Sequence, residues 1–292
     1  MSLTGARIAV IGTGVMAESM VAGLLGRGLV EPSAIVCSHP RAERRALLVE
    51  RHGVTVTESN ATAVADSSVV LLAVKPQVLP EVMPELKGVI RANQLVVSVI
   101  AGATTTALAR GLVHEAVVRA MPNTPSQIGA GVTVWYATAA VDAAGRTQAR
   151  QMLAALGREF EVHNERQVAM ATAVSGTGPT YIFLFIEALV DAAVRLGFPR
   201  HVARELVLDT MQGSAAFALQ SGKHVAELRD MVTSPGGTSA EALYQLEAGR
   251  LRTVVSDAVM AAFARTEQLE ATLEGLGAAA EEPFGRDSRS GA

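Results

Sequence analysis

The chain has 292 residues, 49% of them hydrophobic and 18% charged, which is enough to build two domains. The net charge of −3 comes without a basic block, so nucleic acid and anionic membranes are excluded as main partners and a small metabolite is favoured. A single cysteine and the lack of a secretory signal predict a cytoplasmic protein. The most apolar helical stretch, residues 181–198, carries charged side chains, so we expect no membrane span.

Short β-branched runs alternate with helix-length segments through the first half of the chain. The runs are residues 8–11, 34–37, 54–56, 69–74, 95–100 and 117–118, with further strands at 132–136 and 159–162. Strands separated in this way form βαβ units and a mostly parallel sheet. We therefore predict an α/β fold, a Rossmann-type doubly wound parallel sheet, over residues 1–163.

Strand signals fade after residue 163. Alanine- and leucine-rich segments with helical spacing follow at residues 178–196, 199–221 and 252–276. They predict an all-α C-terminal domain over residues 164–276. Its helices carry apolar residues on more than one face, which favours a homo-oligomer. The tail, residues 277–292, has no apolar period and is expected to be disordered.

A glycine-rich turn follows the first predicted strand and opens a helix. It reads Gly12, Thr13, Gly14, Val15, Met16, Ala17. The first glycine permits the tight turn, the second lets amides approach a pyrophosphate, and the alanine lets the helix pack on the sheet. The turn therefore predicts a dinucleotide site, with a plain βα connection as the alternative.

The residues after the second strand indicate which dinucleotide binds. An NAD enzyme usually has an acidic residue there, whereas this chain has Ser38 and then Arg41, with Arg44 and Arg45 nearby. A hydroxyl and a guanidinium suit a 2′-phosphate, so NADPH is favoured over NADH, unless this is only a solvated basic helix start. The fourth strand closes on Ala73, Val74, Lys75 and Pro76, where the lysine faces either the cofactor or solvent. No metal site is predicted.

A second glycine-rich loop lies in the helical half, at residues 233–239. Gly236 and Gly237 leave backbone amides uncovered before a helix, and Ser234, Thr238 and Ser239 add hydroxyls. This composition is typical of a carboxylate-binding helix terminus. Thr238 and Glu241 also have capping-box spacing, so a well-capped helix is the alternative.

Together these motifs resemble the Δ1-pyrroline-5-carboxylate reductase family, from about Arg7 to Leu269. The run from Leu228 to Ser239, continued by Ala242, Leu243 and Glu247, is similar to that family's signature. The motifs that support it, in chain order, are the turn at Gly12, Ala73 to Pro76, Met121 to Pro125 and Ser175 to Pro179.

The resemblance implies reduction of the cyclic imine of 1-pyrroline-5-carboxylate to L-proline with NAD(P)H, the last step of proline biosynthesis. It implies interlocked homodimers that often assemble into decamers. Cofactor contacts then fall at Gly12 to Ala17, Ser38, Asn60 and Ala73 to Pro76. Substrate contacts fall at Glu165 and at the loop from Ser234 to Ser239, which includes Gly236, Gly237 and Thr238.

Two segments depart from the family pattern. Ser239 stands where a threonine is usual, and Ala169-Met170-Ala171-Thr172 replaces Asp-Ala-Val-Thr. The Ser239 hydroxyl is retained, and we assign it the catalytic role of orienting the ring nitrogen and relaying its proton. We expect the amides of Gly237, Thr238 and Ser239 to bind the substrate carboxylate.

Two alternatives remain from the sequence. A β-hydroxyacid dehydrogenase would need a catalytic lysine early in the helical half, and no lysine occurs between Lys87 and Lys223. The other alternative is a catalytically silent protein that binds NADP, senses redox state or carries pyridoxal phosphate.

Overall fold

The computed structural model of the chain describes residue 3 and residues 5–279. These residues form two compact units. The first contains residues up to Gly176 and those from Ala262 onward, and the second is Thr177–Ala261. The division lies beyond the expected boundary at residue 163, because helix α7 (Arg166–Ala171) packs against the sheet and the last helix returns to the first unit.

In the described residues of the first unit, eight strands form one sheet in the order β3-β2-β1-β4-β5-β6-β7-β8. All neighbours are parallel except β6 and β7. The strands are β1 Ile8–Ile11, β2 Ile35–Ser38, β3 Thr55–Thr57, β4 Val69–Leu72, β5 Leu95–Ser98, β6 Val117–Met121, β7 Gly131–Ala137 and β8 Gly157–Glu161. The predicted Rossmann-type sheet is confirmed. Its order reverses between β1 and β4, where such folds bind ligands at the strand carboxyl ends.

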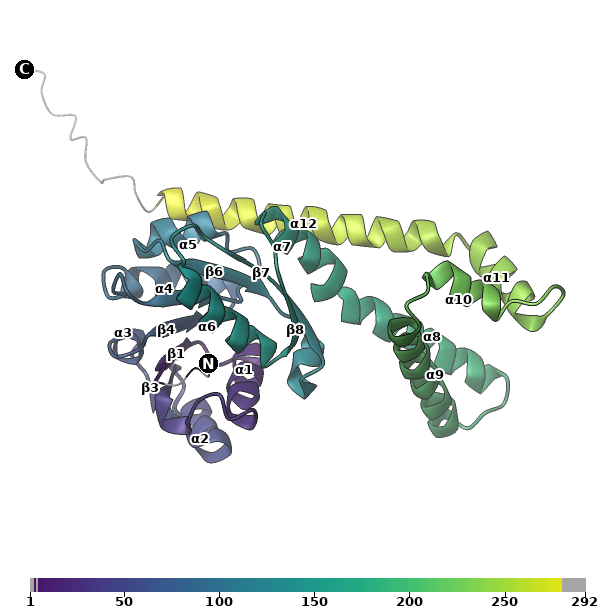
Figure 1. Cartoon of the computed structure of the whole chain (residues 1–292), viewed down its shortest axis with the longest axis horizontal. Helices are drawn as coiled ribbons and strands as arrows, with labels where there is room; N and C mark the ends of the chain where they lie inside the picture. The colour runs from purple at the N-terminus through teal and green to yellow at the C-terminus, as the bar shows by residue number, and fades with distance from the viewer. Residues whose placement is uncertain (1–2, 4, 280–292) are drawn as a thin grey trace, which may run out of the picture. The chain divides into compact units, whose positions relative to one another are not determined.

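Helices cover both faces of this sheet (Figure 1). Ile8 and Val10 of β1 face helices α1 (Val15–Gly26), α2 (Ala42–His52) and α6 (Ala143–Ala154). Ala9 and Ile11 face helices α3 (Asn60–Val64), α4 (Leu79–Leu86) and α5 (Thr105–Leu112). Because strand side chains alternate, a strand buried on both faces must be apolar throughout, as β1 and β4 are.

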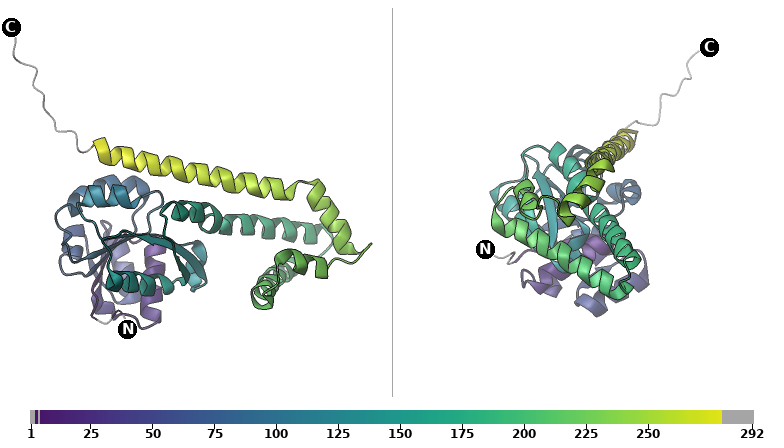
Figure 2. Two further views of the ribbon diagram at one scale, coloured as in Figure 1. Left: turned by 45° about the horizontal axis from the view of Figure 1, so that its top comes forward. Right: turned by 90° about the vertical axis from the view of Figure 1, so that its right-hand side faces the viewer.

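The last helix, α12 (Leu251–Ala279), begins in the second unit and ends in the first. Its end lies over the helices of the first unit in Figures 1 and 2, where Leu273 joins the buried cluster that contains α4 and α5. The helix continues through residue 279, into the expected tail. Residues 280–292 of that tail lie outside the described part of the chain.

Short helical turns complete the first unit. They are the 3-10 turns η1 (Pro32–Ala34), η2 (Pro76–Val78) and η3 (Thr124–Ile128) and the π-turn η4 (Thr172–Gly176). The turn η4 connects α7 to the next helix, and a single π-turn of this kind is frequent at functional sites.

The second unit is helical, as predicted. It contains α8 (Gly178–Arg195), α9 (Arg200–Ser221), α10 (Val225–Met231), α11 (Thr238–Ala248) and the start of α12. Val190 of α8 packs with Ala203 and Val207 of α9, while Phe183 and Leu184 stay 59% and 66% exposed. By length and composition, the helical run Arg166–Arg195 is the one stretch of the described chain that could cross a membrane.

Candidate functional site

The turn after β1 depends on a close approach of two strand ends. Gly12 has φ +82°, and a Cβ there would lie 2.6 Å from Cγ1 and 2.9 Å from the amide nitrogen of Val74. Its own amide donates to the carbonyl of Ser38, at 3.3 Å. Only glycine fits this position, because a side chain would have to displace the backbone that follows β4.

The start of helix α1 forms a cradle for an anion. Gly14 is the N-cap, and a Cβ there would meet no atom within 4 Å. Val15 and Met16 open the helix, and Ala17 is fully buried. The Thr13 hydroxyl is buried and has no hydrogen-bond partner among the described residues. Open space above first-turn amides, next to an unpaired hydroxyl, fits a pyrophosphate.

An arginine supports this turn from behind. Arg44 donates from Nε to the carbonyl of Thr13 at 2.9 Å, and it pairs with Glu18 at 2.5 Å. Glu18 also contacts Arg51 and His52, at 3.0 and 3.3 Å. Burial raises the pKa of Glu18, but its hydrogen bonds with Arg44, Arg51 and His52 outweigh burial and lower that pKa to about 2. Arg44 therefore holds the loop, and its charge is paired with that of Glu18.

The other two arginines after β2, Arg41 and Arg45, differ in whether their guanidinium groups have partners within the protein. Arg45 donates to the carbonyls of His39 and Pro40, at 2.7 and 2.8 Å. The side chain of Arg41 is exposed and makes no hydrogen bond within the described part of the chain. Of the three, Arg41 is the one whose charge is available to a ligand.

The segment after β4 borders the same turn. The amide of Ala73 donates to Ile11 at 2.9 Å, and Val74 contacts Gly12 as described. Lys75 is exposed, and Pro76 opens η2. The structure thus brings Gly12 to Ala17 together with Ala73 to Pro76 at the sheet reversal. Ser38, at the end of β2, donates to Asn60 at 2.5 Å.

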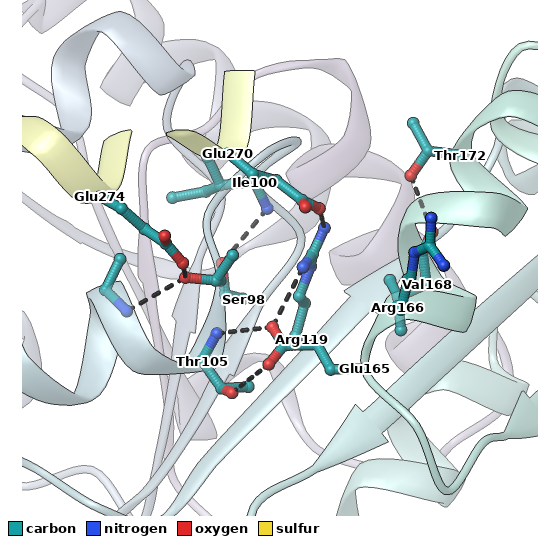
Figure 3. A network of polar contacts seen from close by, with 12 residues as sticks. Ser98, Ile100, Thr105, Arg119, Glu165, Arg166, Val168, Thr172, Glu270 and Glu274 are labelled. Atoms are coloured by element: carbon teal, nitrogen blue, oxygen red, sulfur yellow. Dashed lines mark hydrogen bonds and ion pairs between the residues drawn. The ribbon is translucent and has the colours of Figure 1, made fainter. Parts of the chain in front are cut away.

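A buried arginine in strand β6 connects several elements of the first unit (Figure 3). Arg119 of β6 is 3% exposed and pairs with Glu165 at 3.0 Å and with Glu270 of α12 at 2.5 Å. Glu165 also accepts from the amide and hydroxyl of Thr105, at 2.7 and 2.5 Å. Since Thr105 opens α5, this carboxylate also lies at a helix N-terminus, which favours its charge.

A second contact fixes the same helix. Glu274 of α12 accepts from the hydroxyl of Thr104, the N-cap residue of α5, at 2.8 Å. A Cβ on Gly102, in the loop after β5, would lie 3.0 Å from Cβ of Leu269. These contacts attach the end of α12 to the carboxyl edge of the sheet. Both oxygens of Glu165 already have partners, so its expected contact with substrate stays a prediction.

The loop of the second unit opens helix α11. Gly236 has φ +68°, and the amide of Gly237 donates to the carbonyl of Ser234 at 3.0 Å. Gly237, not Thr238, is the N-cap, and no side chain caps the helix, so the alternative of a capping box at Thr238 and Glu241 is wrong. Because the Gly237 amide closes the turn, the first-turn amides of Thr238 and Ser239 remain as donors for an anion.

Sequence reasoning assigned no individual role to two residues of the first unit, Arg119 and, within the motif from Met121 to Pro125, Asn123. Arg119 interrupts an otherwise apolar strand, and a lone charge in a buried run is the signal that could have found it. Asn123 donates to the carbonyl of Ser175 at 3.1 Å and accepts from the amide of Val132 at 2.9 Å. It therefore connects η3 to the π-turn and to β7. No cluster of three or more potential metal ligands occurs among the described residues.

A glycine-rich turn at the reversal of a parallel sheet, followed by a helical unit, is the architecture of a nicotinamide-dependent oxidoreductase. The model of the family described as pyrroline-5-carboxylate reductase dimerisation matches residues 165–269. That of the NADP oxidoreductase coenzyme F420-dependent family matches residues 7–102. The pyrroline-5-carboxylate reductase of Pseudomonas aeruginosa is 42% identical over 264 residues, which cover 90% of this chain and 96% of that protein.

Solved structures agree with this relationship. The pyrroline-5-carboxylate reductase of Coxiella burnetii has a TM-score of 0.84 and 37% identity, covering 90% of this chain and 98% of its own. The Plasmodium falciparum pyrroline carboxylate reductase, solved with NADP bound, has a TM-score of 0.83 and 27% identity, covering 91% and 98%. The chain belongs to the pyrroline-5-carboxylate reductase family.

Alanine at the two fingerprint glycines should separate folding from cofactor binding. Gly12→Ala forces a Cβ into Val74, so we expect the free energy of unfolding to fall by about 2–4 kcal/mol. Gly14→Ala should leave stability unchanged within about 0.5 kcal/mol, because its Cβ points into open space, yet weaken NADPH binding at least about tenfold. Urea unfolding and fluorescence titration measure the two effects. Unchanged NADPH affinity in Gly14→Ala would contradict the assignment of the cradle.

Removing the buried guanidinium should destabilise the first unit. Arg119→Met leaves two partly buried carboxylates without their cation, and we expect a loss of about 3–5 kcal/mol in urea unfolding. Arg166→Met is the matched control, because it breaks an exposed pair with Glu267 and should cost at most about 1 kcal/mol. Equal losses in the two variants would show that the Arg119 network contributes no more than a surface pair.

Proposed function

We propose that this protein is a pyrroline-5-carboxylate reductase that reduces 1-pyrroline-5-carboxylate to L-proline, the last step of proline biosynthesis, with NADPH as preferred donor. The observation that carries the proposal is membership of the family across 90% of the chain. The exposed guanidinium of Arg41 after β2 supports the preference for NADPH. A cytoplasmic location stays a prediction.

The main requirement of this reaction is that the protein places the imine carbon of the substrate next to the hydride of the cofactor. NADPH supplies the hydride when bound, and the residues that would hold it are those of the turn at Gly12 and the segment from Ala73 to Pro76. A protonated imine carbon is already electrophilic, so no strong general base is needed. The site must fix the ring and exclude water.

The start of α11 offers suitable groups for the substrate. The amides of Thr238 and Ser239 would bind its carboxylate, favoured by the helix dipole. The Ser239 hydroxyl would orient the ring nitrogen and relay its proton. Ser234 shapes this turn, because its carbonyl accepts from the amide of Gly237.

Oxidation of NADPH on addition of 1-pyrroline-5-carboxylate tests the activity and the role of Ser239 together. We expect turnover by the unaltered chain and a fall in kcat/KM of about tenfold to a hundredfold in Ser239→Ala, the cost of one lost polar contact in the transition state. Ser239→Thr keeps the hydroxyl and should retain activity.

Two outcomes would contradict these assignments. Folded protein that binds NADPH but shows no turnover would favour the catalytically silent alternative. A Ser239→Ala variant with unchanged kcat and KM would remove the serine from the mechanism. Thermal melting of each variant separates both outcomes from misfolding.

We also propose a homodimer, or a decamer of five dimers, formed by the helical unit. Phe183, Leu184 and Val255 are 59%, 66% and 48% exposed in the single chain, and burying such side chains stabilises association. The family match at residues 165–269, described as dimerisation, supports association through this part of the chain. Sedimentation velocity should show a species larger than a monomer, and a monomer at working concentration would overturn the proposal.

A further inference from the structure

A directed chain of hydrogen bonds runs from the end of β2 to helix α4. The hydroxyl of Ser38 donates to Oδ1 of Asn60 at 2.5 Å, and Nδ2 of Asn60 donates to Oε2 of Glu85 at 2.7 Å. A carboxylate can only accept, so the amide of Asn60 must turn its NH2 group to Glu85 and its oxygen to Ser38. The amide hydrogens of Asn60 are therefore directed at Glu85, and the hydroxyl hydrogen of Ser38 is directed at Asn60.

These hydrogen bonds also connect the core of the first unit to its surface. Ser38 is fully buried, Asn60 is half-buried and Glu85 is exposed. The carboxylate is thus the member of the three that solvent, or a ligand, reaches most readily.

The end of β2 is where doubly wound folds distinguish the two nicotinamide cofactors. A carboxylate there accepts from the ribose 2′-hydroxyl of NADH, and a cation there pairs with the 2′-phosphate of NADPH. The sequence after β2 offers only the cation, Arg41. The fold adds a carboxylate from α4, some 50 positions along the chain from Ser38, as the hydrogen bonds through Asn60 show.

We infer that Glu85 is a specificity-determining residue that opposes Arg41 and narrows the preference for NADPH over NADH. The negative charge of Glu85 repels a 2′-phosphate. Because Glu85 accepts from the amide of Asn60, that amide is not available to donate to the phosphate. The 2′-hydroxyl of NADH can donate to the same carboxylate, so Glu85 does not weaken the binding of NADH. The inference rests on the proposed dinucleotide site and adds a determinant of its selectivity.

Adenosine fragments isolate this effect from hydride transfer. Titration calorimetry with 2′,5′-ADP and with 5′-AMP gives the contribution of the 2′-phosphate as a ratio of two dissociation constants. In Glu85→Gln we expect this ratio to shift toward 2′,5′-ADP by about tenfold, because one negative charge facing the phosphate is lost. Glu81→Gln removes the same charge from an exposed position on the same helix and should shift the ratio by less than about twofold.

Each outcome has a distinct meaning. If the unaltered protein binds neither fragment, the proposed dinucleotide site itself fails. If both fragments bind but Glu85→Gln leaves the ratio unchanged, or Glu81→Gln shifts it equally, the role of Glu85 is overturned. Glu85→Ala provides a second variant at the same exposed position and should shift the ratio in the same direction as Glu85→Gln.

Discussion

The close approach of Gly12 to Val74 is the constraint on which the rest of the cofactor site depends. Two parallel strands end side by side at the reversal of the sheet, and no side chain fits between the backbones that leave them. Gly12 also has a positive φ, +82°, and helix α1 begins three residues later, at the reversal of the sheet. The hold of Arg44 on the Thr13 carbonyl then fixes the turn from the other side.

Charge is distributed along the carboxyl edge of the sheet in a consistent way. Arg44 pairs with Glu18, and Arg119 pairs with both Glu165 and Glu270, so these two arginines hold a loop and a helix in place. Arg41 keeps its charge exposed. A ligand at this edge therefore lies near the positive charge of Arg41 and the negative charge of Glu85, which is hydrogen-bonded to Asn60. The balance of these two charges sets the affinity for a 2′-phosphate.

The second unit supplies a different kind of group. Its loop from Ser234 to Ser239 presents backbone amides at a helix terminus, an arrangement that suits a carboxylate without a charged side chain. Hydride transfer to a protonated imine is assisted by such positioning, because the substrate is already activated. The departure at Ser239 keeps a hydroxyl, the group on which the proposed mechanism depends.

The sequence by itself determined the sheet, the helical second half, the fingerprint turn and the family. These are local patterns, since apolar runs and glycine spacing depend on near neighbours in the chain. Only the tertiary structure decided which arginine stays available, that Glu165 and Glu270 share Arg119, and that Glu85 reaches Asn60. Those pairs join residues far apart in sequence, and no local pattern specifies which strand end a distant carboxylate will meet.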